Sequence, residues 1–300
     1  MKKLRNKRPL VSVIMPVYNA GVYLREALQS VLDQTYKNIE VIAYNDGSTD
    51  NSLQTLLEFK LKEPRLRVYS HPKRLGTGET SNRAITKAKG ELIARMDADD
   101  LIPEGRIQKQ VKFLLDNPHI VVVGGQVELV SEDGSPIITK HFPQNHNEIL
   151  NMSFISMPIQ QGAMMINTSL LPRNFSWYNT KYNTSEDLDL FFRLFNYGQG
   201  ANLKDVILFY RQHGKSITQA ENPKEIFFNA YRVRQLAILK YNYKISLLAR
   251  FTSAFQYSLI FLLPESFIYP IYYFWRGLKP SINPIAGLHP LFKHAFSYII

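Results

Sequence analysis

Short apolar segments and helix-like segments alternate through the first hundred residues, and this alternation limits the folds open to the chain. Apolar runs of strand length are separated by stretches with apolar residues at helical spacing. We expect strands at Val11–Met15, Ile39–Tyr44, Leu66–Tyr69 and Glu91–Met96, and helices at Val22–Asp33, after Asp50, and at Glu79–Lys89. Short connections between such elements are typical of βαβ units and predict an α/β fold with a mainly parallel sheet.

The middle of the chain has a less regular pattern. We expect a helix at Pro103–Asn117 and a strand or hairpin at Ile120–Val130, followed by a turn at Asp133-Gly134. A further helix is predicted at Ser185–Tyr197, with Ser185 as its N-cap and acidic residues in its first turn.

Polar residues follow three of the predicted strands at the points where they end. These segments are Pro16-Val17-Tyr18-Asn19, Asn45-Asp46-Gly47-Ser48 and Asp97-Ala98-Asp99-Asp100. Open parallel sheets bind ligands at the carboxyl ends of their strands. Two of the three ends are acidic, which favours a ligand that is cationic or donates hydrogen bonds.

The paired carboxylates of Asp97 and Asp99 are the clearest candidate for a metal site. Two carboxylates at one strand end repel each other and lose hydration, and a hard divalent cation shared with substrate phosphates removes both penalties. The alternative is a solvated acidic turn, which the three-residue motif alone does not exclude.

Several blocks together resemble the family 2 glycosyltransferases, which are inverting enzymes with the GT-A fold. The blocks are Val11–Asn19, Ser30–Thr35, Ile39–Asp50, Ala88–Asp100 and Glu186–Leu190, in that order. The resemblance covers residues 9–220 and implies a Rossmann-like three-layer sandwich. We therefore expect a catalytic domain at 1–220 and a helical, aromatic-rich basic extension at 221–300.

The resemblance implies a nucleotide pocket at the first two strand ends. Pro16, Tyr18 and Asn19 would line it, and Asp46 would accept hydrogen bonds from the base. A carboxylate can accept from the N3–H of uracil, and a tyrosine ring can pack on the base. The alternative is that Asp46 makes a local turn and Tyr18 belongs to the core. Asn45 stands where many relatives carry a second Asp.

The same resemblance implies a Mn²⁺ or Mg²⁺ ion that neutralises the diphosphate leaving group. Asp99 would be its main ligand. Asp97 would contact the ribose, or the metal through water, and His213 is a further candidate ligand. Arg211 in the same segment is a candidate phosphate contact.

The catalytic base of the family corresponds to Asp187, with Glu186 as the second candidate. An inverting transfer needs a carboxylate that takes the proton of the attacking hydroxyl, and a helix's first turn holds such a group rigidly. The alternative is that these acids only stabilise the helix dipole.

The net charge of +11 is confined to the chain ends. Residues 1–10 carry five Lys or Arg and no acid, residues 221–300 carry nine Lys or Arg and three Glu, and 11–220 carries 22 of each sign. A nucleic-acid-binding body more often spreads basic charge over its core, so no nucleic-acid partner is expected. The segment Phe251–Trp275 holds ten aromatic residues and has basic flanks. This composition favours contact with a membrane surface. The alternatives are a helical subdomain packed on the core and a dimer contact.

These observations and the resemblance predict an inverting, metal-dependent glycosyltransferase that uses a nucleotide sugar, and we expect a UDP-sugar. The acceptor would be a hydroxyl of a glycan or a lipid-linked molecule in cell-surface polysaccharide synthesis. We expect the enzyme in the cytoplasm, on the inner face of the membrane, without a secretory signal peptide. The absence of cysteine excludes thiol catalysis and disulfides. The alternatives are a nucleotidyltransferase, for which the Gly-rich, Lys-containing loop is missing, and a non-catalytic membrane- or nucleic-acid-binding protein.

Overall fold

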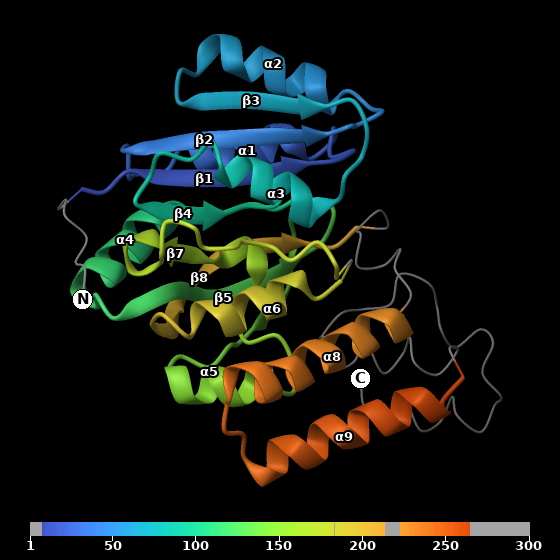
Figure 1. The fold of residues 1–300 in the computed structure, drawn as a ribbon. Coiled ribbons are helices and arrows are strands. Elements are labelled where there is room, and N and C mark those ends of the chain that lie inside the picture. The colour runs from blue at the N-terminus through green and yellow to red at the C-terminus, as the bar shows by residue number, and fades with distance from the viewer. Residues whose placement is uncertain (1–7, 183, 214–222, 265–300) are drawn as a thin grey trace.

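An eight-stranded sheet forms the centre of the computed structural model, which describes residues 8–182, 184–213 and 223–264 (Figure 1). Its order is β3-β2-β1-β4-β7-β5-β6, with β8 paired to β5. The strands are β1 Val11–Val17, β2 Ile39–Asp46, β3 Leu66–His71, β4 Leu92–Arg95, β5 Ile120–Val130, β6 Pro136–Lys140, β7 Met165–Asn167 and β8 Gln199–Arg211. The α/β fold expected from the alternating pattern is confirmed.

The first four strands run parallel, as the sequence predicts. Because helices cover both faces of a parallel sheet, its strands are largely apolar, and every residue of β2 is buried. Beyond β4 the sheet becomes mixed. The three-residue strand β7 pairs antiparallel with both β4 and β5, and no pattern in the sequence predicted it.

Each predicted helix is present, with differences at its ends, and α5 is a helix that the sequence pattern did not predict. They are α1 Leu24–Leu32, α2 Ser52–Lys62, α3 Thr77–Ile85, α4 Arg106–Asp116, α5 His146–Ser153, α6 Glu186–Leu194, α8 Pro223–Tyr241 and α9 Leu247–Leu262. The prediction for α3 ran to Lys89, but Lys87 and Ala88 form tight i→i−3 turns that lead into β4. Ser185 is the N-cap residue of α6, as predicted, but at a φ of +68° its side chain makes no capping hydrogen bond and donates instead to the Ile226 carbonyl.

Helices cover both faces of the sheet and produce the expected three layers. One core cluster joins α1, α2 and α4 to one face, through residues such as Leu28, Leu56 and Val111. A second cluster joins α3, α5 and α6 to the other face, through residues such as Ala84 and Phe191.

Two further helices extend this sandwich on the α6 side (Figure 1). Val233 and Ala237 of α8 pack on Leu188 and Phe192 of α6, and α9 lies against α8. Within the described residues, no helix has the length and hydropathy required to cross a membrane. Two parts of the predicted basic and aromatic ends lie outside the described residues: the basic residues 1–7 and the part of the aromatic stretch beyond residue 264.

Candidate active site

The strand register brings the predicted ligand-binding ends to one edge of the sheet. Val17 of β1 is paired with Asn45 of β2, and Ile14 of β1 is paired with Arg95 of β4. Tyr18 and Asp46 therefore follow the same edge that Asp97 reaches just after β4. The structure thus brings together groups that lie up to 80 residues apart in the chain.

Asn19 joins the first two loops of this edge. Its backbone N–H donates to Ser48 Oγ at 3.1 Å, and its side-chain oxygen accepts from the Thr49 N–H at 2.8 Å. Asn19 has a φ of +49°, a conformation that Asn tolerates better than most residues. Next to it, the guanidinium carbon of Arg74 lies 4.2 Å from the centre of the Tyr18 ring. Tyr18 is only partly buried, so it is not a core residue.

Asp46 fixes the loop that leads into α3. It is 2% exposed, and its two carboxylate oxygens accept from the backbone N–H groups of Leu75 and Gly76 at 2.7 and 2.9 Å. Gly76 has a φ of +93°, which only glycine adopts readily. A contact between Asp46 and a base remains a prediction, since the observed partners of this carboxylate belong to the protein itself.

A buried arginine lies beneath the acidic turn. Arg95 is 1% exposed, and its Nη2 lies 2.9 Å from Asp97 Oδ1, while its carbonyl accepts from Arg106 at 3.0 Å. Burial raises the pKa of Asp97, Arg95 opposes that shift, and Asp99 adds to it. Burial also lowers the pKa of Arg106 to about 9. Gly162 packs closely here, because a Cβ on it would lie 2.8 Å from Asp97 Oδ2.

The end of β8 approaches the acidic turn from the other side. His213 Nε2 lies 3.0 Å from Asp99 Oδ2, and the Arg211 backbone N–H donates to Asp100 Oδ1 at 2.9 Å. Burial raises the pKa of Asp100 well above its usual range, and its Oδ2 makes no hydrogen bond. Asp99 and His213 are therefore adjacent, as a shared metal would require. Over the described ranges, no three His, Asp or Glu side chains are grouped to hold a metal ion.

A polar cluster holds Arg211 and His213 in place. Arg211 Nη2 donates to Glu26 Oε2 at 2.6 Å, and its guanidinium carbon lies 4.8 Å from the Tyr23 ring centre. The Tyr23 ring packs on the His213 ring at 4.6 Å, and its hydroxyl donates to Glu132. Arg211, a candidate phosphate contact, anchors β8 to α1 through this ion pair, and its contact with phosphate remains a prediction.

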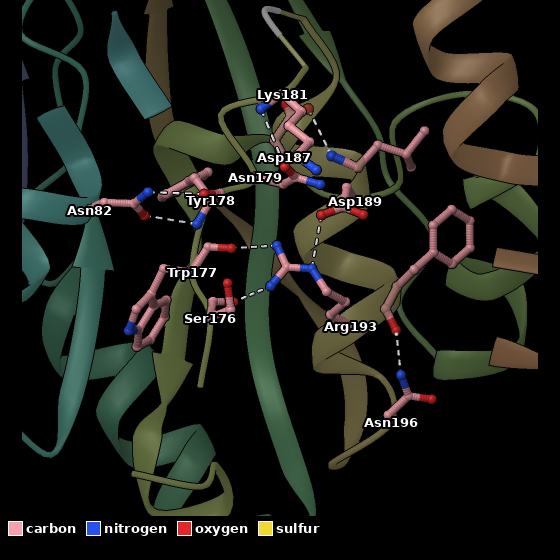
Figure 2. A network of polar contacts seen from close by, with 12 residues as sticks. Asn82, Ser176, Trp177, Tyr178, Asn179, Lys181, Asp187, Asp189, Arg193 and Asn196 are labelled. Atoms are coloured by element: carbon pink, nitrogen blue, oxygen red, sulfur yellow. Dashed lines mark hydrogen bonds and ion pairs between the residues drawn. The ribbon is translucent and has the colours of Figure 1, made fainter. Parts of the chain in front are cut away.

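A second network positions the segment before α6 (Figure 2). The Asn82 side chain of α3 pairs with the Tyr178 backbone, donating to its carbonyl at 2.9 Å and accepting from its N–H at 2.8 Å. From the other side, Arg193 of α6 donates to the carbonyls of Ser176 and Trp177 and to Asp189. The segment is thus fixed to two helices.

The Tyr178 side chain links the two halves of the site. Tyr178 is 3% exposed, and its hydroxyl makes no hydrogen bond of good geometry. Burial raises its pKa to about 12; Arg95 lowers that value, while Asp187 and Glu186 raise it. The Tyr178 side chain therefore lies within electrostatic range of both Arg95 and the first turn of α6. The Asp187 carboxylate accepts from the Leu188 N–H at 2.8 Å, and the Glu186 side chain faces Gly78 of α3.

The comparisons with known proteins agree with this architecture. A family model described as glycosyl transferase family 2 matches residues 12–183, more than half of the chain. The chain belongs to this family. It is therefore a glycosyltransferase, as the sequence motifs predicted.

The relatives include an uncharacterised glycosyltransferase of Haemophilus influenzae, 32% identical over 72% of this chain and 70% of that protein. The chain spans about half or less of the length of two other curated relatives. Among solved structures, S. aureus TarS 1-349 in complex with UDP-GlcNAc has a TM-score of 0.62 at 22% identity, covering 77% of this chain and 67% of that one. The mannosyltransferase PcManGT from Pyrobaculum calidifontis, in complex with GDP-Man and Mn²⁺, has a TM-score of 0.64 at 17% identity, covering 99% and 83%. Because the sequence identities are below 25%, these two structures establish only the fold of the chain, and that fold is the expected GT-A fold.

Proposed function

We propose that this glycosyltransferase moves a sugar from a nucleotide diphosphate to an acceptor hydroxyl with inversion at the anomeric carbon. The observation that carries the proposal is the buried Tyr178, which lies within electrostatic range of both Arg95, the partner of Asp97, and the first turn of α6. In the reaction, the acceptor oxygen bonds to the anomeric carbon as the bond from that carbon to the diphosphate oxygen breaks. The hydroxyl proton passes to a carboxylate, and the nucleoside diphosphate leaves.

We assign the base to Asp187 and keep Glu186 as the second candidate. A base of this kind must be held within hydrogen-bond reach of the attacking hydroxyl. Asp187 starts a helix whose preceding segment is fixed by Asn82 and Arg193, so little conformational entropy is lost on reaching the reactive geometry. Glu186 packs toward Gly78 of α3.

The nucleotide would bind across the first two strand ends. Pro16, Tyr18 and Asn19 would line the base and ribose, with the Arg74 guanidinium over the Tyr18 ring available to the diphosphate. Asp46 holds the neighbouring loop and would accept from the base with its remaining lone pairs. We propose a UDP-sugar as donor, because an N–H of uracil suits this carboxylate.

A divalent cation fits the chemistry of the acidic turn. Asp99 and His213 lie 3.0 Å apart, and Asp97 is the adjacent carboxylate. Carboxylates suit Mg²⁺ and Mn²⁺, and such ions commonly take only one or two protein ligands and complete their shell with substrate phosphates and water. Asp99, with Asp97 and His213 as further ligands, would hold Mn²⁺ or Mg²⁺. When bound, the ion would neutralise charge on the leaving diphosphate.

We propose that the acceptor is a glycan or lipid-linked hydroxyl used in cell-surface polysaccharide synthesis, and that the protein acts in the cytoplasm on the inner membrane face. The basic, aromatic extension supports this placement. The family match does not favour the nucleotidyltransferase or non-catalytic alternatives.

A donor screen tests the proposed function. The full chain is incubated with UDP-, GDP- and dTDP-sugars in Mn²⁺ or Mg²⁺, and release of each nucleoside diphosphate is measured with and without EDTA. We expect metal-dependent release from a UDP-sugar, absent in Asp99→Ala. If no donor across a broad panel gave metal-dependent release, the proposal would fail.

A further inference from the structure

Helix α9 buries a face of mixed polarity and exposes its largest apolar side chains. Its face against α8 consists of Ala249, Ser253, Gln256 and Ile260, each at most 8% exposed. Ser253 Oγ and Gln256 Oε1 make no hydrogen bond there. Its outer face carries large apolar side chains that are 64–77% exposed: Leu247, Phe251, Phe255, Phe261 and Leu262. A helix that meets only water on its outside has the opposite arrangement.

These five side chains, which we call the α9 outer face, form a continuous stripe. Leu247, Phe251 and Phe255 are spaced four residues apart, so they lie one above the other on the helix. Isolated apolar residues are common on protein surfaces, but a contiguous apolar patch marks an interaction site. The α9 outer face is therefore expected to lie against an apolar partner.

Basic residues border the α9 outer face at the start of the helix. Lys240, Lys244 and Arg250 are exposed before or within the first turn of α9, and the sequence contains no acid between Glu225 and Glu265. A second copy packed on this face by two-fold symmetry would bring like-charged rims together. An anionic lipid surface would instead meet both the apolar stripe and the cationic rim favourably.

The place of α9 in the fold suits such a surface. It packs on α8, which packs on α6, so α9 is the layer farthest from the sheet on that side (Figure 1). A planar surface can therefore meet the α9 outer face without covering the carboxyl edge of β1, β2 and β4. No described helix is able to span a membrane, and an in-plane position of α9 is consistent with that finding.

We propose that the α9 outer face binds the surface of an anionic lipid bilayer, with Phe251 and Phe255 entering the headgroup–acyl boundary. This deepens the proposed function by assigning its membrane partner to one helix face. The binding itself needs no nucleotide, metal or acceptor, so its failure is distinguishable from failure of the transfer reaction.

The absence of cysteine in the chain makes a site-specific probe possible. Phe255→Cys in the full chain is labelled with a polarity-sensitive fluorophore, and Leu61→Cys on α2, where Leu61 is 88% exposed, serves as the matched control. The probes are vesicles of phosphatidylcholine alone and of phosphatidylcholine with phosphatidylglycerol. We expect a blue shift at position 255 only with the anionic vesicles, weakened by high salt, and none at position 61.

Flotation with the same vesicles provides a second readout. F251Q/F255Q should lower partitioning about tenfold or more, because two aromatic side chains no longer leave water. The matched double variant L57Q/L61Q on α2 should bind as the unaltered chain does. Circular dichroism and thermal melting confirm that both variants fold.

Three results would overturn the proposal. One is the absence of vesicle binding by the unaltered chain, and another is equal binding by F251Q/F255Q. The third is a label at position 255 that is shielded from iodide quenching before vesicles are added. That shielding would mean that a second copy or another segment of this chain covers the face, and ultracentrifugation would distinguish these two occupants.

Discussion

Substitution of Asn82 by alanine tests whether the segment before α6 must be held for catalysis. The change removes two hydrogen bonds to the Tyr178 backbone, at 2.9 and 2.8 Å. At about 1 kcal/mol net for each, the free energy of unfolding should fall by about 2 kcal/mol. For a chain of this size, that corresponds to a drop of roughly 4–8 °C in melting temperature.

The catalytic effect of Asn82→Ala should exceed its effect on folding. Tyr178 and the first turn of α6 would no longer be fixed to α3, so we expect kcat to fall by at least about tenfold, with a smaller change in the KM for donor. Asn117→Ala is the matched control, because it removes one partly buried hydrogen bond to the Phe113 carbonyl at 2.9 Å, on α4. The assay is nucleoside diphosphate release at a temperature where both variants are folded. An Asn82→Ala enzyme with unaltered kcat would refute the positioning role.

Three further changes probe other parts of the site. Tyr178→Phe should leave the free energy of unfolding at pH 7 unchanged or higher, since the buried hydroxyl makes no hydrogen bond of good geometry. The folded pKa of Tyr178, about 12, is above its unfolded value of 10.0, so its stabilising contribution is present below pH 10 and is lost as the pH rises to 12. Urea denaturation at pH 7 and pH 11 measures this effect. Between these pH values, the free energy of unfolding should fall by about 1.4 kcal/mol less in Tyr178→Phe than in the unaltered chain, and equal falls would contradict this. Gly162→Ala should abolish donor turnover while the chain stays folded, because its Cβ would lie 2.8 Å from the Asp97 carboxylate. Gly78→Ala is the control, since its Cβ would have its nearest contact at 3.6 Å, and it should keep its activity. Equal activities of the two variants would exclude close packing of Gly162 on Asp97. His213→Gln should raise the Mn²⁺ concentration for half-maximal activity by about tenfold or more, as expected for loss of a metal ligand; an unchanged metal titration would remove His213 from the metal site.

The sequence predicted the parallel half of the sheet well, because its local signals agree with the fold. Apolar runs of strand length and amphipathic helices identify β1 to β4 and α1 to α3 without any long-range information. The antiparallel strand β7 was not predicted, since its three residues, Met165–Asn167, form a strand only by pairing with β4 and β5.

The acids of the candidate site were predictable from their motifs, but their supporting residues were not. Among these supporting residues, Arg95 is the one that the local sequence best indicates, because it is a cation in an apolar strand two residues before Asp97. The pairing of Asn82 with Tyr178 joins residues 96 positions apart, and nothing in either local sequence indicates it. The contacts of Arg211 with Glu26 and Tyr23 likewise join distant parts of the chain, and the local sequence does not indicate them.

We assign the acids after β4 and the first turn of α6 to different roles in one transfer reaction. The most direct measurement compares Asp99→Asn and Asp187→Asn for donor binding by calorimetry in Mn²⁺ and for transfer to acceptor. We expect Asp99→Asn to lose metal-dependent donor binding, whereas Asp187→Asn should bind donor normally and transfer at least about a thousandfold more slowly. Transfer by Asp187→Asn at the unaltered rate would contradict this assignment.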